Sequence, residues 1–282
     1  MDTKPVNPLA GHFRRPSIYF KLPSKGKFWA DGKLELPVSG DIPVYPMTNA
    51  DEITLKTPDA LMNGAGIVSV IQSCCPNIRD AWEMPSVDVD AVLIAIRIAS
   101  YGTNMAITAK CPSCNEEHDY DINLSMLLDK VKCPNFDAPI AFDGLKIKMR
   151  PQKYFNVTKT SITQFEEQKI MQALADTTID DEVRNTRIKH SMLTLLELND
   201  NLLVSGTEYI EIEDGTQVSN PDYIKEFYKN ANGQVVKNIE ARLNEISKES
   251  AIPASSVTCG SCSHVYDIPV EFDYSRFFVT GS

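Results

Sequence analysis

The chain has 282 residues, of which 43% are hydrophobic and 23% charged, and this is the composition of a globular protein with a buried core. Its formal net charge of −10 disfavours a protein that binds broadly to nucleic-acid phosphates. The first residues lack the apolar segment of a signal peptide, and no apolar run approaches about 18 residues, so we expect cytoplasmic synthesis and no membrane span.

Residues 1–47 are predicted to form an extended N-terminal arm or short strands. A Lys-Gly pair inside Ile18–Trp29 is typical of a turn between two apolar segments. Two short segments, Leu34–Val38 and Ile42–Pro46, contain prolines, which favour sheet edges or chain that contacts a partner. The arm is therefore expected to lie at a sheet edge or against another protein.

A helical region is predicted over residues 48–103. Asn49, followed three residues later by Glu52, indicates a capping box at the start of a first helix. The sequence Thr57-Pro58-Asp59 supplies a cap, a proline at the first helical position and an acid at the positive end of the helix dipole. A second helix is expected to begin there.

The last helix of this region is expected over Ser86–Gly102. It is apolar on almost every side from Ala91 to Ala99, which indicates a helix buried at the centre of the body. Arg97 is its one basic residue, and we expect a carboxylate partner for it, because a buried charge is costly without one.

Two distant stretches share one sequence pattern. Cys111–Cys114 has the sequence Cys-Pro-Ser-Cys, Cys259–Cys262 has the sequence Cys-Gly-Ser-Cys, and each is followed by His-x-Tyr-Asp-Ile. Strands are predicted on both sides of each pair, within residues 104–123 and 255–272. Counted from the Cys pair to the shared histidine, the first hairpin is expected to be two residues longer than the second.

Two Cys-x-x-Cys pairs supply the four thiolates of a tetrahedral structural zinc site. We therefore predict that the two hairpins are the halves of one zinc ribbon and clamp together two Cys pairs that have 144 residues between them. The predicted ligands of this single ion are Cys111, Cys114, Cys259 and Cys262.

Three alternatives to this zinc site remain open. In a cytoplasmic protein, seven cysteines favour metal ligands or free thiols, but a disulfide or two independent redox Cys-x-x-Cys motifs are also compatible with the pattern. In the third alternative, His118 or His264 replaces one of the cysteines as a zinc ligand.

Between the hairpins, residues 124–254 are predicted to form a mainly helical insertion. Together the elements predict an α+β fold, with a mainly helical body, a zinc ribbon assembled from two distant knuckles and an extended N-terminal arm. Within the insertion we expect helices over about Phe165–Leu174, Asp180–Leu198 and Val235–Ile246, a strand at Leu145–Arg150 and a hairpin turn at Asp214-Gly215.

The chain shows little sign of catalytic chemistry. Phosphate-binding, dinucleotide-binding, zinc-protease and nucleophile-elbow motifs do not occur in the sequence. The chain has only four histidines, and no pair of carboxylates stands out. We therefore predict a protein that is not an enzyme, with neither catalytic nor organic-cofactor-binding residues.

Several stretches resemble one protein family. The sequence PMTNADEITLKTPDALMNG, the sequence VIQSCCPNIRDAWEMPSVDVDAVLIAIRIASYG and the CPSC knuckle after it are similar to the baseplate hub or hub-assembly proteins of T-even-type contractile-tailed bacteriophages. The N-terminal RRPSIYFKLPSKGKFW and the C-terminal VEFDYSRFFVTGS fit the same resemblance. It covers most of the chain and implies a non-enzymatic virion or assembly protein of the tail baseplate, made in the host cytoplasm and in contact with other baseplate or hub subunits.

Aromatic residues near both ends are the candidate contacts for such partners, because Tyr, Trp, Phe and Arg are enriched at interface cores. The alternative is that these side chains pack back onto their own domain. The N-terminal candidates are Tyr19, Phe20, Phe28 and Trp29, and those of the C-terminal tail, residues 273–282, are Tyr274, Arg276, Phe277 and Phe278.

The sequence therefore favours a structural or assembly protein of a phage baseplate that acts through protein contacts. The competing hypothesis is a zinc-ribbon protein that binds nucleic acid. The net charge of −10 and the scarcity of basic and aromatic residues within the knuckles argue against that alternative.

Overall fold

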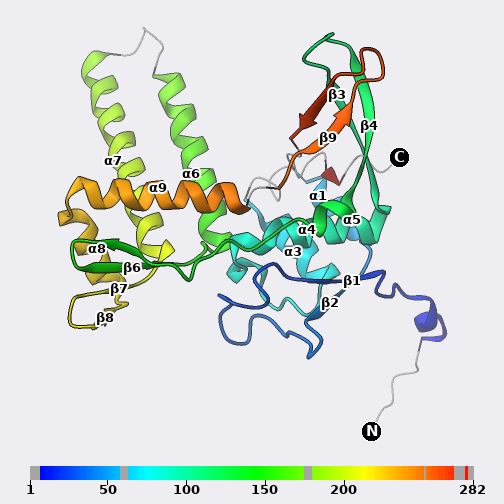
Figure 1. Cartoon of the computed structure of the whole chain (residues 1–282), viewed down its shortest axis with the longest axis horizontal. Coiled ribbons are helices and arrows are strands. Elements are labelled where there is room, and N and C mark those ends of the chain that lie inside the picture. The colour runs from blue at the N-terminus through cyan, green and yellow to red at the C-terminus, as the bar shows by residue number, and fades with distance from the viewer. Residues whose placement is uncertain (1–6, 58–62, 175–179, 251, 270–276, 279–282) are drawn as a thin grey trace.

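The computed structural model describes residues 7–57, 63–174, 180–250, 252–269 and 277–278. Figure 1 shows a helical body at the centre, two β-hairpins on one side of it, and a second lobe of helices and a small sheet on the other side. The predicted α+β class is confirmed. No helix among the described residues is long and apolar enough to cross a bilayer.

The body is built around one buried helix. Its elements in chain order are η1 (Pro8–His12), β1 (Ile18–Lys21), β2 (Asp41–Val44), α1 (Asn49–Leu55), α3 (Ala65–Cys74), η2 (Ala81–Glu83) and α4 (Ser86–Tyr101). Every residue of α4 from Ala91 to Ala99 is buried, as its almost entirely apolar sequence predicted. Cys74 and Cys75 are also buried, within the hydrophobic cluster that surrounds α4.

The N-terminal segment is bound to this body. Within its described part, residues 7–47, only β1 and β2 form strands, paired antiparallel with Phe20 opposite Ile42, and both of these side chains are buried. Leu34–Val38 forms no strand and contributes a single bridge from Leu34 to Ile78. The segment thus contains two short strands, and its apolar side chains supply part of the body's core.

Asp88, in the first turn of α4, fixes the turn that follows β1. One carboxylate oxygen accepts the backbone N–H of Ser24 at 2.8 Å, and the other accepts the Ser24 hydroxyl at 2.5 Å and the Trp29 indole N–H at 2.9 Å. Burial nevertheless raises the pKa of this carboxyl above its ordinary value, in opposition to these three hydrogen bonds.

Arg97, on the same helix, binds the end of the chain. Its guanidinium donates to the backbone carbonyl of Phe277 and lies over the rings of Tyr101 and Phe277, 5.5 and 5.2 Å from their centroids. A carbonyl and two aromatic faces therefore contribute to the environment of this buried charge.

The first helix begins one residue earlier than predicted. Its cap is Thr48, whose hydroxyl accepts the backbone N–H of Asp51 while the Asp51 carboxylate accepts the N–H of Thr48. The capping box is therefore Thr48 with Asp51, because a hydroxyl and an acid three residues apart satisfy both backbone donors. The predicted start of the second helix at Pro58 lies outside the described residues, and the described helix of this region is α3, which begins at Ala65.

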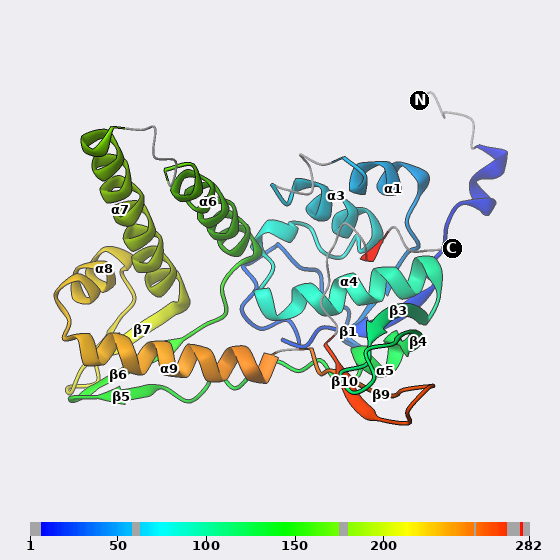
Figure 2. The same ribbon diagram turned by 90° about the horizontal axis from the view of Figure 1, so that it is seen from above.

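The second lobe follows the first hairpin in sequence. It contains a four-stranded antiparallel sheet in the order β5-β6-β7-β8, and α9 packs beside β5. α6 and α7 project from this sheet as a pair of antiparallel helices (Figures 1 and 2). α5 (Leu124–Leu128) comes first in the sequence and packs on α4 in the body. The elements of the second lobe are β5 (Ile140–Phe142), β6 (Leu145–Met149), α6 (Tyr154–Ala173), α7 (Asp181–Gly206), β7 (Thr207–Glu211), β8 (Gln217–Val218), α8 (Pro221–Asn230) and α9 (Gly233–Ser250).

Candidate metal centre

The two Cys-x-x-Cys pairs form turns with the same backbone structure. In the first, the backbone N–H of Asn115 donates to the carbonyl of Cys111 at 2.9 Å, and the backbone N–H of Cys111 donates to the backbone carbonyl of Glu116 at 2.9 Å. In the second, the backbone N–H of Ser263 donates to the carbonyl of Cys259 at 3.0 Å, and the backbone N–H of Cys259 donates to the backbone carbonyl of His264 at 2.8 Å.

The residue after each Cys pair completes this equivalence. Asn115 and Ser263 both adopt the left-handed conformation, with φ of 61° and 58°. A left-handed residue at this place turns the chain back on itself and aims both sulfurs of a pair to the same side. Each turn joins two antiparallel strands: β3 (Asn104–Lys110) and β4 (Glu117–Asn123) in the first hairpin, β9 (Ser255–Thr258) and β10 (Val265–Ile268) in the second.

The strand register corrects the predicted difference in hairpin length. Lys110 pairs with Glu117 and Thr258 pairs with Val265, so both turns have the same length from the first cysteine. The repeated His-x-Tyr-Asp-Ile therefore sits two residues further along β4 than along β10. Because side chains alternate with a period of two, the shift leaves the repeated residues on the same face of each strand.

The four sulfurs of the two turns meet in one cluster. The Sγ atoms of Cys111 and Cys262 lie 3.7 Å apart, those of Cys114 and Cys259 lie 3.6 Å apart, and all four lie within 4.8 Å of one another. Zn–S bonds of about 2.3 Å give a tetrahedron with edges of about 3.8 Å, whereas a disulfide needs about 2.05 Å. The sulfurs are thus spaced as ligands of one ion rather than as disulfide partners.

The backbone around the cluster favours a negative charge on one sulfur. Hydrogen bonds from the backbone N–H groups of Cys262 and Ser261 lower the pKa of the Cys259 thiol to about 6. At Cys114 the N–H of Glu116 also lowers the pKa, but burial and the neighbouring thiols outweigh it and raise the pKa to about 12. Four sulfurs so close together cannot all be ionised without a cation between them.

The two histidines lie beside the cluster in different ways. His118 makes a hydrogen bond through Nε2 with the hydroxyl of Ser261 at 3.2 Å, and that hydroxyl donates to the carboxylate of Glu116. His264 stacks on the ring of Tyr266 at 6.2 Å. The first hairpin is therefore joined to the second turn by side chains as well as by the cysteines.

The faces of the hairpins touch through equivalent aromatic residues. The rings of Tyr120 and Tyr266 pack edge to face at 6.1 Å, and their hydroxyls lie 3.2 Å apart. Further from the cysteines, Ile122 and Ile268 are both buried. The sulfur cluster thus lies at one end of a small interface between the two hairpins, which are far apart in the chain.

The four N-terminal aromatic residues predicted to contact partners differ in how far their side chains are buried. Tyr19 on β1 is 65% exposed, whereas Phe20 is buried. Phe28 packs edge to face on Phe136 at 5.4 Å, and Trp29 is half-buried with its N–H bound to Asp88. Of these four, Tyr19 alone presents most of its surface to a partner.

The C-terminal candidates give a similar result. Phe277 and Phe278 are each only 4% exposed and belong to the core of the body. Their burial favours the alternative in which they pack on their own domain. Tyr274 and Arg276 lie outside the described residues.

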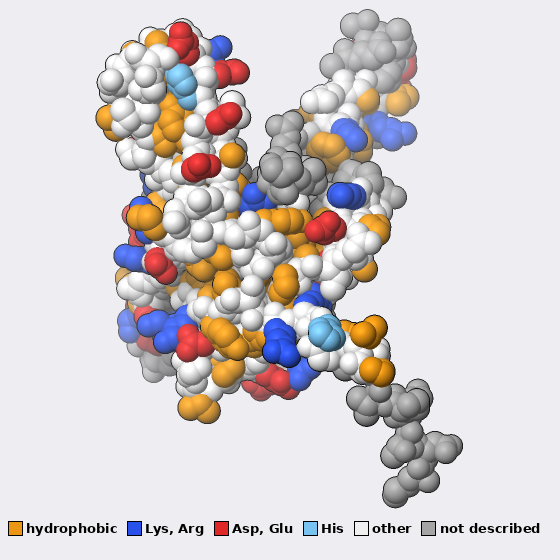
Figure 3. Space-filling model, turned by 90° about the vertical axis from the view of Figure 1, so that its right-hand side faces the viewer, with side chains coloured by type: hydrophobic (Ala, Val, Ile, Leu, Met, Phe, Trp, Pro, Cys, Tyr) orange, Lys and Arg blue, Asp and Glu red, His pale blue; other side chains and the backbone are white. Residues whose placement is uncertain are grey.

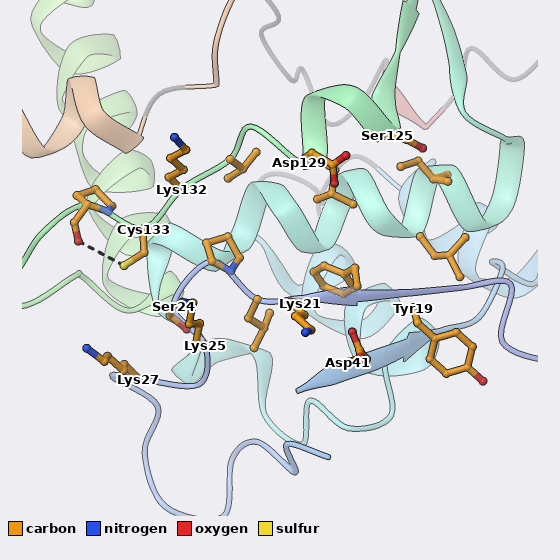
Figure 4. Close-up of a pocket in the computed structure, with 18 of the residues that line it drawn as sticks. Tyr19, Lys21, Ser24, Lys25, Lys27, Asp41, Ser125, Asp129, Lys132 and Cys133 are labelled. Carbon is orange, nitrogen blue, oxygen red and sulfur yellow. Dashed lines mark hydrogen bonds between the residues drawn. The ribbon is translucent and has the colours of Figure 1, made fainter. Parts of the chain in front are cut away.

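Tyr19 lies beside a groove of about 940 Å³. One wall is β1 and the turn after it, and the other runs from α5 to Asp137. Figure 4 shows Tyr19 pointing away from the middle of the groove, with Lys21, Lys25 and Lys27 along the first wall and Lys132 on the second. Cys133 is half-buried here, and its thiol donates to the carbonyl of Pro134 at 3.5 Å.

Sequence reasoning missed the surface of the projecting helices. Much of the apolar surface of α6 and α7 faces solvent, although helices normally bury such residues. The run Met192–Leu196 holds four large apolar residues within five positions, too many for one buried face, and this signal was present in the sequence. The most exposed members of the two helices are Phe155, Phe165, Val183, Met192, Leu193 and Leu196.

Comparison with known proteins gives one match. A family model described as T4 bacteriophage base plate protein matches residues 16–279, which is nearly the whole chain. No curated protein and no solved structure matches the chain.

Proposed function

This chain belongs to the T4 bacteriophage base plate protein family, and we propose that it is a structural or assembly component of the hub region of a phage tail baseplate. It acts through contacts with other baseplate subunits and catalyses no reaction. The single observation that supports this role is the family match over residues 16–279. The protein is made in the host cytoplasm and is either retained in the virion or released after assembly.

One structural zinc ion belongs to this proposal. Four cysteines leave no open position for a substrate or a water molecule at a tetrahedral ion, so the metal would be structural. Cys111, Cys114, Cys259 and Cys262 would be its ligands, because their sulfurs have the spacing of a tetrahedral site. His118 and His264 would support the ribbon from outside the ligand set.

The zinc would hold the two ends of the insertion together. The two hairpins are the proposed halves of one ribbon, and residues 124–254 are inserted between them. Holding the ends of so long an insertion together costs chain entropy, which metal binding can offset. With its two ends joined rigidly at the ribbon, the second lobe would keep a fixed place relative to the body, as a component of a multi-subunit particle requires.

Nucleic-acid binding by the ribbon is the weaker candidate. The outward-facing positions of β4 include Glu117, Asp119 and Asp121, all exposed, and these acids would repel phosphates. Figure 3 shows basic and acidic side chains interspersed with apolar ones on the face that it displays, rather than gathered into one basic stripe.

Two measurements test the proposal. Native mass spectrometry of the purified chain, with and without a chelator, should show one zinc per chain that the chelator removes. Mixing the chain with the other hub subunits of its phage should give a complex that co-sediments. A chain that binds none of those subunits, but binds single-stranded DNA in a salt-sensitive manner, would replace the baseplate role with the alternative.

A further inference from the structure

The outer side of α7 carries a short stripe of four residues, in which a basic residue is followed by two leucines and then an acidic residue. Leu193 and Leu196 are 52% and 62% exposed and form its centre. Lys189 lies one turn before them and Asp200 one turn after them. The spacings of four, three and four residues put all four side chains on one face of a helix.

This face lies at the periphery of the molecule. In both views of the ribbon, α6 lies between α7 and the helical body (Figures 1 and 2). Lys189 is exposed and Asp200 half-exposed, and neither has an ion-pair partner among the described residues. Met192, also more than half exposed, borders the stripe and widens its apolar centre.

The fold already uses the next part of this face for helix packing. α8 covers the last turns of α7, where Leu203 is buried and Lys225 bonds to Asn201 at 3.1 Å. The stripe continues that face beyond the end of α8. A second helix could cover Leu193 and Leu196 as α8 covers Leu203, and it would have to cross α7 at an angle to avoid α8.

We propose that the occupant of this stripe is the α7 helix of a second copy of this chain, in antiparallel orientation. A two-fold axis between residues 194 and 195 places Leu193 of each copy against Leu196 of the other. The same axis places Lys189 of each copy against Asp200 of the other. One apolar centre is then flanked by two identical ion pairs, which is the self-complementarity that a two-fold interface requires.

The charges distinguish this pairing from others. A parallel pairing in register would place Lys189 beside Lys189 and Asp200 beside Asp200, and like charges at such positions are destabilising. α7 as a whole carries three basic and four acidic residues, so it approaches a second copy without the strong repulsion expected from the net charge of −10.

The size of the stripe sets the expected affinity. From Lys189 to Asp200 the helix rises roughly 17 Å, which gives an interface below the standard size of protein complexes. The dimer is therefore expected to be weak and to form at high protein concentration. Such a contact suits a chain that is gathered with others of its kind in a larger assembly.

Sedimentation equilibrium of the full-length, metal-loaded chain over a concentration series tests this inference. The wild type should move from monomer to dimer, and Lys189→Asp should lower the association constant by about tenfold or more. The double variant K189D/D200K should restore it, because it exchanges the two ends of each ion pair. Arg187→Asp is the matched control, since residues two apart on a helix point to nearly opposite sides.

A cross-link locates the contact independently. A zero-length carbodiimide reagent applied to a mixture of ¹⁴N- and ¹⁵N-labelled chains should join Lys189 of one isotope to Asp200 of the other. Within one chain these residues are too far apart along the helix to react. A chain that stays monomeric at every concentration would overturn the inference, as would equal loss in K189D and R187D, or a dimer that the double variant does not restore.

Discussion

The hydroxyls of Tyr120 and Tyr266 lie 3.2 Å apart although the two residues are 146 positions apart in the chain. Each is the tyrosine of one copy of His-x-Tyr-Asp-Ile, and each stands on the inward face of its hairpin. The repeated sequence is thus the two sides of one interface, joined at one end by the sulfur cluster and further along by the aromatic pair.

The cysteine cluster predicts metal dependence that single substitutions reveal. Cys114→Ser is expected to reduce the zinc content from one ion per chain to none, because three thiolates and a hydroxyl bind zinc far more weakly than four thiolates. Native mass spectrometry measures the stoichiometry. Cys133→Ser is the control, since Cys133 lies outside the cluster. Full zinc content in C114S would exclude the four-cysteine site.

Loss of the ion should affect the hairpins before the body. The hydrophobic cluster around α4 and that of the second lobe do not include the four cysteines. Hydrogen exchange of C114S is therefore expected to show lost protection in β3, β4, β9 and β10, with α4 still protected. Equal loss of protection throughout the molecule would mean that the metal holds the whole fold together.

The tyrosine pair predicts a non-additive result. Tyr120→Phe and Tyr266→Phe each remove the same hydroxyl contact, so each should lower the melting temperature slightly, and the double variant should be no less stable than the less stable single variant. Thermal unfolding of the three zinc-loaded variants tests this. Additive losses would show that each hydroxyl also has its own partner.

Asp88 predicts a dependence of stability on pH. Its pKa is raised in the folded state by burial, so the stability that it contributes is complete below the unfolded-state pKa of about 3.9 and is partly lost as the pH rises through the folded-state pKa. Asp88→Asn should cost about 2–3 kcal/mol near neutral pH, because it leaves donors of Ser24 and Trp29 without an acceptor. Urea unfolding at pH 4 and pH 7 should show a larger cost at pH 4, and a larger cost at pH 7 would contradict the raised pKa.

Zinc affinity should fall as the solution becomes acidic. The ligands bind as thiolates, so uptake of the ion releases protons from thiols such as Cys114, whose pKa is raised to about 12. Cys259 has a pKa of about 6, so it contributes no proton at pH 8 but begins to compete for one below pH 6. A competition titration with a chelator should therefore show a steeper loss of affinity below about pH 6 than above it.

Alanine substitutions of the aromatic residues near the two ends of the chain should have different effects on stability and on partner binding. Phe277→Ala is expected to destabilise the fold by about 3 kcal/mol, because it empties a site in the core of the body. Tyr19→Ala should leave stability nearly unchanged and weaken capture of baseplate subunits, since this side chain is exposed beside the groove. Chemical unfolding and co-sedimentation separate the two effects, and unchanged capture by Y19A would remove Tyr19 from the partner surface.

The amino-acid sequence by itself determined the parts whose physical cause is local. A stretch of nine residues in which only Arg97 is polar predicted the buried helix α4, and the spacing within two Cys-x-x-Cys pairs predicted two turns that each aim two sulfurs to one side. It also carried the family resemblance that the match over residues 16–279 confirms. Periodicity and ligand spacing are properties of neighbouring residues, so they can be read without knowing the fold.

Only the tertiary structure decided which distant groups meet. The burial of Phe20, Phe277 and Phe278 depends on the body that packs around them, and an aromatic residue near a chain end has the same sequence signal whether it faces a partner or its own core. The equal length of the two cysteine turns became apparent only from the strand pairing. An alignment on the shared histidines makes the first turn look two residues longer than the second. The exposure of Leu193 and Leu196 likewise follows from where α6 and α8 pack, because burial depends on neighbours that the local sequence of α7 does not specify.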